Sequence, residues 1–178
     1  MGVLDGLQPQ LFFHCFEELT RIPRGSGDMR RISDYLAAFA RDRGYETVQD
    51  EALNVIVRIP ATPGHADRAP LILQGHMDMV AVRDAVSAVD PTKDALRLGI
   101  DGDLIYAEGT SLGGDDGFAI ACFCALMEDR SIEHPALTLV MTTDEETGMN
   151  GARAVDPALL DADCLVNLDS EEEGVLLA

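Results

Sequence analysis

Apolar residues recur every three or four positions through the first forty residues, which predicts two amphipathic helices. The first covers residues 8–22 and the second covers residues 29–44. Pro23 and Gly44 are expected to help end them. The positions that form the two apolar faces are Leu11, Phe12, Cys15, Phe16 and Leu19 in the first helix, and Ile32, Tyr35, Leu36 and Phe39 in the second.

The chain then changes to short, continuous apolar runs, the pattern of buried strands. "LRLGIDGDLIYAEG" predicts a hairpin that turns at Asp101–Gly102, and "GGDDGFAIACFCALMED" predicts an apolar helix that starts with glycines and carboxylates. Alternating helices and apolar strands predict an α/β three-layer sandwich around a mixed, largely parallel sheet. The expected strands of this sheet cover residues 45–51, 54–60, 70–74, 136–143 and 163–168.

The charge and apolar content of the chain limit the classes of molecule that it is expected to bind. Thirty-two acidic residues against thirteen basic ones give a net charge of −19, which disfavours binding to nucleic acid or to anionic membranes. The apolar runs are shorter than the ~20 residues that span a bilayer, and "MGVLDGLQPQLFF" lacks the pattern of a signal peptide. We therefore expect a soluble, cytoplasmic protein. The four cysteines lie in apolar segments without a C-x-x-C pair and are expected to be buried, reduced thiols.

Residues able to bind a metal follow three of the expected strands and open the helix at Gly114. If those strands are adjacent and parallel, their carboxyl ends meet at one edge of the sheet. One imidazole with several carboxylates suits zinc, or alternatively manganese or cobalt. Each motif alone is more often a solvated loop, a turn or a helix cap, and the joint placement favours a metal site. The residues concerned are His76, Asp78, Asp115, Asp116, Asp144, Glu145, Glu146 and Asp169.

Four motifs occur together in this order: "LQGHMDMV", "EGTSLGGDDG", "MTTDEETGMNGA" and "LVNLDSEEEG". In this combination the chain, from about Leu7 onward, resembles the aminoacyl-histidine dipeptidases. These form one branch of the co-catalytic di-zinc peptidases, which also include aminoacylases and carboxypeptidases. The turn "IPRGSGD" is part of the resemblance.

The resemblance implies a role for each site residue. His76 and Asp169 would bind one zinc ion, Glu146 the other, and Asp115 would bridge the two. Cobalt or manganese could replace zinc. Glu145 would be the general base that acts on a metal-activated water, and Asp78 would orient His76. A cis peptide between Asp115 and Asp116 is also implied, and Asp144 is left as a solvated residue.

The resemblance also implies that this chain is shorter than the family members it resembles. Residues 1–178 would be the N-terminal part of a catalytic domain, without its C-terminal part, the lid or dimerisation domain, and a further histidine ligand. We expect hydrolysis of dipeptides, of Xaa-His type such as carnosine, with little or no activity in this chain alone. An exposed sheet edge would favour a homodimer. The alternatives are an aminoacylase or deacetylase of the same family, and a non-catalytic metal-binding remnant. Specificity for the substrate side chain is left open.

Overall fold

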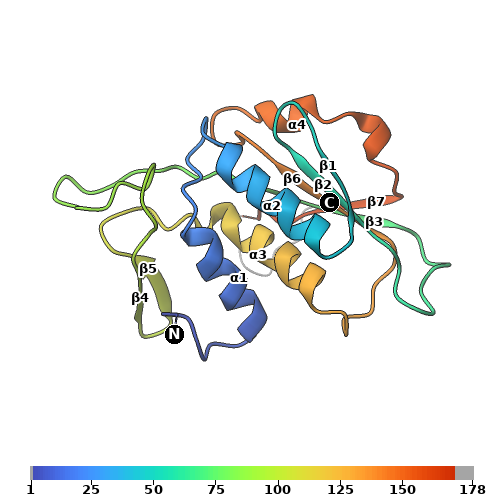
Figure 1. Cartoon of the computed structure of the whole chain (residues 1–178), viewed down its shortest axis with the longest axis horizontal. Coiled ribbons are helices and arrows are strands. Elements are labelled where there is room, and N and C mark those ends of the chain that lie inside the picture. The colour runs from blue at the N-terminus through green and yellow to red at the C-terminus, as the bar shows by residue number, and fades with distance from the viewer. Residues whose placement is uncertain (1, 171–178) are drawn as a thin grey trace.

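The computed structural model describes residues 2–170, which form a sheet with the three longest helices on one face (Figure 1). Helices α2 and α3 contact the sheet, and α1 packs against α3. The expected helices are therefore confirmed. The helices are α1 (Gln10–Thr20), α2 (Arg30–Asp42), α3 (Gly114–Glu128), α4 (Asn150–Ala154) and the 3₁₀ helix η1 (Pro157–Leu159). The strands are β1 (Glu46–Gln49), β2 (Val55–Ile59), β3 (Leu71–His76), β4 (Leu98–Asp101), β5 (Leu104–Ala107), β6 (Leu137–Thr142) and β7 (Cys164–Asn167).

The main sheet is mixed, with the strand order β1-β2-β6-β3-β7 over the described residues. β2 runs antiparallel to both β1 and β6, whereas β3 runs parallel to both β6 and β7. In this register His76 lies opposite Thr142, and Gln74 lies opposite Asn167. The carboxyl ends of β3, β6 and β7 therefore share one edge of the sheet, as the sequence predicts.

The core lies mainly between the sheet and helices α1–α3. All six residues of β6 are buried, and Phe123 and Leu36 are fully buried on the helical side. Each fully buried Leu, Val, Met or Phe side chain among these contributes about 1.5–3 kcal/mol to stability. On the other face of the sheet, Ile56, Ile72 and Val140 pack against Leu159 and neighbouring residues after α4. This thinner cover supplies the third layer of the predicted sandwich.

Strands β4 and β5 form a separate hairpin, as expected. Its two connecting residues are Gly102 and Asp103, one position later than predicted. Gly102 has a φ of +59°, a conformation that glycine adopts without steric cost. Within residues 2–170, no helix has the length and apolar character needed to cross a bilayer.

The expectation that all four cysteines are buried is wrong for one of them. Cys15 and Cys124 are buried and Cys122 is partly buried, but Cys164 is exposed. Cys164 opens β7, which pairs with β3 and has no second partner among the described strands. An apolar strand at the edge of a sheet keeps side chains in solvent, which the sequence pattern does not distinguish from a central strand. None of the four cysteines forms a disulfide.

Candidate metal centre

His76 is the last residue of β3 and its side chain is only 1% exposed. The residue before it, Gly75, lets the start of α3 approach the strand. A Cβ atom at Gly75 would lie 2.5 Å from Asp116 Oδ2 and 2.6 Å from the Ala119 Cβ. The glycine in "QGHMD" therefore allows a helix start that carries two carboxylates to pack directly beside His76.

The two ring nitrogens of His76 face different groups. Nδ1 lies 3.3 Å from Asp78 Oδ1, in the interior of the protein. Nε2 lies 2.9 Å from Asp115 Oδ1, 3.9 Å from Asp169 Oδ2 and 4.0 Å from Glu145 Oε2. The imidazole thus presents one nitrogen to carboxylates from α3, from the exit of β6 and from the exit of β7.

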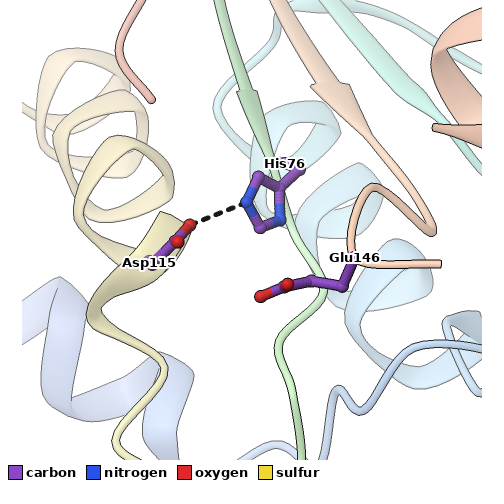
Figure 2. A group of neighbouring side chains, drawn as sticks. All are labelled: His76, Asp115 and Glu146. Atoms are coloured by element: carbon purple, nitrogen blue, oxygen red, sulfur yellow. Dashed lines mark hydrogen bonds and ion pairs between the residues drawn. The ribbon is translucent and has the colours of Figure 1, made fainter. Parts of the chain in front are cut away.

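Glu146 completes the cluster at the mouth of the site. Figure 2 shows Asp115 and Glu146 pointing toward the His76 ring, one from α3 and the other from the loop after β6. One ligand-type atom from each of these three residues lies within 4.8 Å of the other two. The Asp115 side chain is 70% exposed and Glu146 is exposed, so the cluster opens to solvent. One imidazole with several carboxylates is a donor set that fits zinc.

Asp78 connects the histidine to the loop after β6. Its carboxylate is completely buried and accepts hydrogen bonds from Ser26 Oγ at 2.8 Å and from the backbone amides of Glu145 at 3.1 Å and Glu146 at 3.4 Å. Burial raises the pKa of Asp78, but His76, Ser26 and the Glu145 amide outweigh it, and the net pKa is lowered. One buried carboxylate therefore fixes both the His76 ring and the backbone of the two glutamates.

Opposing effects act on the pKa of His76. Burial lowers its pKa, but hydrogen bonding to Asp78 and Asp115 and the nearby negative charge of Asp116 outweigh burial and raise the pKa to about 9. Desolvation and the neighbouring Asp115 raise the pKa of Glu146. The repulsion between these carboxylates is the kind of interaction that a divalent cation relieves.

Asp115 and Asp116 are joined by a cis peptide bond, as the resemblance implies. Asp115 faces His76, whereas Asp116 is buried and accepts hydrogen bonds from the His76 amide at 3.0 Å and the Ala119 amide at 3.3 Å. Burial raises the pKa of Asp116 to about 6, against the lowering effect of its bond to the His76 amide. Asp116 thus joins β3 to α3, while its neighbour remains available to a ligand.

Asp144 is partly solvent-exposed, and it also makes a structural contact that the sequence does not predict. Asp144 is partly buried, has a φ of +54°, and its carboxylate accepts a hydrogen bond of 2.6 Å from the Gly27 amide. It therefore ties the exit of β6 to the turn after α1. A partner of this kind is a main-chain group, which the residue types in "DEETG" do not reveal.

Arg24 supports the backbone around the site and was not predicted from the sequence. It is 2% exposed, and its guanidinium donates hydrogen bonds to the carbonyl oxygens of Met77, Asp78 and Gly113. Burial lowers its pKa to about 10, and the nearby charge of Asp78 opposes that shift. The available signal was a basic residue inside the turn "IPRGSGD", next to glycine.

The other three histidines lie outside this cluster. His14 belongs to α1, His65 lies 3.2 Å from Glu133, and His134 Nδ1 lies 2.7 Å from the Pro135 carbonyl oxygen. Among residues 2–170, the imidazole of the cluster is therefore that of His76 alone. The additional histidine ligand implied by the resemblance is not supplied by this part of the chain.

A cavity of about 380 Å³ adjoins the cluster at Glu146. Backbone and side chains of the turn after α1 form one wall, including Gly25, Ser26 and Asp28. The segment that follows Asp78 forms the other wall with mostly apolar residues, among them Met79 and Val82. This cavity offers space for part of a small substrate next to the metal-ligand candidates.

The chain is similar in sequence to known peptidases. It is 37% identical over 174 residues to the cytosol non-specific dipeptidase of Escherichia coli strain K12, covering 98% of this chain and 36% of that protein. No family model matches the sequence. The chain therefore spans about a third of the length of this curated relative.

Solved structures of peptidases share the fold of this chain. The aminoacylhistidine dipeptidase from Vibrio alginolyticus superposes with a TM-score of 0.93 at 33% identity, covering 96% of this chain and 35% of that one. A tripeptidase from Staphylococcus aureus superposes with a TM-score of 0.76 at 26% identity, covering 92% of this chain and 44% of that one. The predicted relationship to the dipeptidases and the predicted α/β fold are confirmed.

Proposed function

We propose that this chain, homologous to dipeptidases over about a third of their length, carries the metal centre and general base of a metal-dependent dipeptidase. The observation that carries the proposal is the position of His76 Nε2, which lies within 4.0 Å of carboxylate oxygens from Asp115, Glu145 and Asp169. Three separate elements supply those carboxylates. Such convergence of carboxylates on one imidazole nitrogen is the geometry that a metal site needs.

In this proposal His76, Asp115 and Asp169 would hold one zinc ion, and Asp115 and Glu146 would supply ligands to a second. Cobalt or manganese would suit the same donors. When bound, the metal supplies Lewis acidity that polarises the carbonyl group of the peptide bond. The fit of the residues rests on their chemistry and on the close grouping of His76, Asp115 and Glu146.

Glu145 is proposed as the general base. Its carboxylate is partly buried beside His76, and its backbone amide is held by Asp78. From this position it would take a proton from the attacking water and return it to the nitrogen of the leaving amine. Asp78 would keep the His76 ring in the orientation that points Nε2 at the carboxylates.

The proposed substrates are dipeptides, including those of Xaa-His type. The Vibrio relative is named for aminoacylhistidine substrates, whereas the Escherichia coli relative is named non-specific and cytosolic. We propose that the cavity beside Glu146 receives one of the two residues, and that the protein acts in the cytosol. Because this chain spans about a third of these relatives, we expect it to have little or no activity without residues that lie outside it.

Two matched variants test this function: Glu145→Gln and Glu146→Gln. Zinc binding to the 178-residue chain is measured by calorimetry. Hydrolysis of β-alanyl-histidine and of dipeptides without histidine is measured on this chain and on the protein isolated from its source. In the protein isolated from its source, Glu145→Gln should lower turnover by about 10²–10⁴-fold. In the 178-residue chain the same change should leave the zinc affinity nearly unchanged. Glu146→Gln should weaken the binding of a second ion. Absence of zinc binding, or full turnover in Glu145→Gln, would contradict the proposal.

A further inference from the structure

We propose that Arg24 is a positioning residue for the metal centre, and this inference rests on the function proposed above. Its guanidinium holds the exit of β3 against the start of α3. In doing so it sets the spacing between His76, at the end of β3, and Asp115, in the first turn of α3. These two side chains come from distant parts of the sequence, yet His76 Nε2 and Asp115 Oδ1 lie 2.9 Å apart.

The contacts of Arg24 join two segments through one rigid group. Nη1 donates to the carbonyl oxygen of Met77 at 3.1 Å and to that of Asp78 at 3.0 Å, both just after β3. Nη2 donates to the carbonyl oxygen of Gly113, the residue before α3. Since the guanidinium is planar, these three bonds fix the two segments relative to each other.

The glycines of "GGDDG" provide a second and independent observation. A Cβ atom at Gly113 would lie 2.5 Å from Arg24 Nη2 and 2.6 Å from Met79 Sδ. A Cβ atom at Gly117 would lie 2.6 Å from the same Nη2 atom. Real Cβ atoms do not approach other atoms this closely. Gly113 and Gly117, two positions before and after Asp115, therefore leave free the space that the guanidinium occupies.

The charge of Arg24 is also matched to its surroundings. Removing a guanidinium from water is costly unless nearby charges and hydrogen bonds compensate. Its carbonyl partners accept three hydrogen bonds from the guanidinium. The negative charges of Asp78, Asp116, Asp115 and Glu146 also favour the charged form of Arg24. Arg24 is thus a buried cation near the acidic cluster. The three hydrogen bonds described above all go to main-chain carbonyl oxygens.

The test uses Arg24→Lys, Arg24→Ala, Gly117→Ala and the double variant Arg24→Ala/Gly117→Ala. Lysine keeps the charge but lacks the planar fork of donors. Zinc affinity is measured by calorimetry, and the absorption spectrum of cobalt in the site reports the ligand geometry. A third measurement needs no metal: the hydrogen-exchange rate of the His76 amide, which donates to Asp116 Oδ2 at 3.0 Å across the β3–α3 junction.

Arg24→Lys should lose about 10–100-fold in zinc affinity, as is typical when groups that support metal ligands are removed. Its cobalt spectrum should change, and its His76 amide should exchange faster relative to amides of β2. Gly117→Ala should show the same changes because the new methyl group displaces the guanidinium. The double variant should be close to Arg24→Ala, since the displaced group is already absent and the remaining close contact of the new methyl group is the milder one with Phe16 Cε2 at 3.3 Å. Leu36→Ala is the control, a core change in α2 that should lower stability yet keep the zinc affinity within about 2–3-fold.

A folded Arg24→Lys protein with wild-type zinc affinity, cobalt spectrum and His76 exchange would overturn the inference. If both Arg24 variants fail to fold, Gly117→Ala decides, because it retains the arginine. If the wild-type chain binds no zinc, the proposed function fails. The His76 exchange rate in Arg24→Lys and Gly117→Ala then still decides whether Arg24 positions the two segments.

Discussion

His76 Nδ1 lies 3.3 Å from Asp78 Oδ1, and the two side chains are 1% and 0% exposed. A carboxylate at this distance favours a proton on Nδ1, so Nε2 is the nitrogen that would lose its proton and offer a lone pair to a metal ion. Asp78 also accepts hydrogen bonds from the backbone amides of Glu145 and Glu146. The same buried group therefore orients a proposed ligand and the loop that carries the proposed base.

Replacing Asp78 by asparagine should weaken zinc binding by about 10–100-fold. The amide keeps the size of the side chain but removes the negative charge beside Nδ1, so the tautomer of His76 is no longer fixed. Calorimetric titration with zinc checks this. Asp103→Asn, in the exposed hairpin turn, is the control and should bind zinc like the wild type. Unchanged affinity in Asp78→Asn would show that the contact does not orient the ligand.

The stability of the metal-free protein should fall as the pH rises through about 9. The pKa of His76 is raised from 6.5 to about 9 in the folded chain, so the folded state binds this proton more tightly than the unfolded state. The resulting stabilisation is fully present below pH 6.5 and is lost as the pH approaches and passes 9. Thermal unfolding from pH 6 to pH 10 with a chelator present measures it. The same series with His76→Gln should lack this component.

Zinc affinity should change with pH in the opposite direction. Zinc binds the neutral imidazole and therefore displaces the proton that the folded protein holds at His76. Affinity should rise with pH up to about 9, with release of about one proton per ion near pH 7. Calorimetry in two buffers of different ionisation enthalpy counts the protons. Zinc binding without proton release at pH 7 would mean that His76 is neutral in the metal-free protein or is not a ligand.

Gly75→Ala should destabilise the protein by about 1–3 kcal/mol, the usual range for overpacking. The added methyl group would lie within 2.6 Å of both the Asp116 carboxylate and the Ala119 methyl group, which belong to the start of α3. Gly114→Ala is the matched control, because a Cβ atom there has no neighbour within 4 Å. Urea unfolding of the two variants gives the comparison. Equal stability would mean that α3 can shift away from β3 at little cost.

Cys164 should be the first cysteine of the 178-residue chain to react with a thiol reagent at pH 8. It is exposed at the edge of the sheet, whereas burial raises the pKa of Cys15 to about 11 and that of Cys124 well above its usual value. Mass spectrometry after brief labelling with iodoacetamide identifies the site. Labelling of Cys15 before Cys164 would contradict the exposed position of β7.

The sequence predicts the edge of the sheet at which the site forms, because the pattern depends on strand type and strand order. His76, Asp115 and Asp169 each follow or open a strongly apolar element. Parallel pairing of β3 with β6 and β7 brings the strand exits together, and the packing of α3 on β3 places Asp115 beside them. Their roles as metal ligands stay predictions. The sequence does not specify the partners of Arg24 or Asp144, since these are main-chain carbonyls and an amide that any residue type provides.

The exposure of Cys164 was not predictable for a related reason. "DCLVNL" has the apolar character of a strand covered on both faces. Exposure depends on what lies beyond the strand in space, and β7 pairs on one side only within the described residues. Local composition specifies a strand but does not specify its neighbours.

The position of β7 beside β3 also has a consequence for the order of events during synthesis. Gln74 of β3 and Asn167 of β7 are paired in this register, and they are 93 positions apart in the chain. Contacts over such separations form late, because the entropy of closing the intervening loop must be overcome first. A nascent chain that has exposed His76, Asp115 and Glu146 to solvent still lacks Asp169 until β7 leaves the ribosome. Under the proposed assignment, the ligand set His76, Asp115 and Asp169 is therefore complete only after residue 169 has left the ribosome.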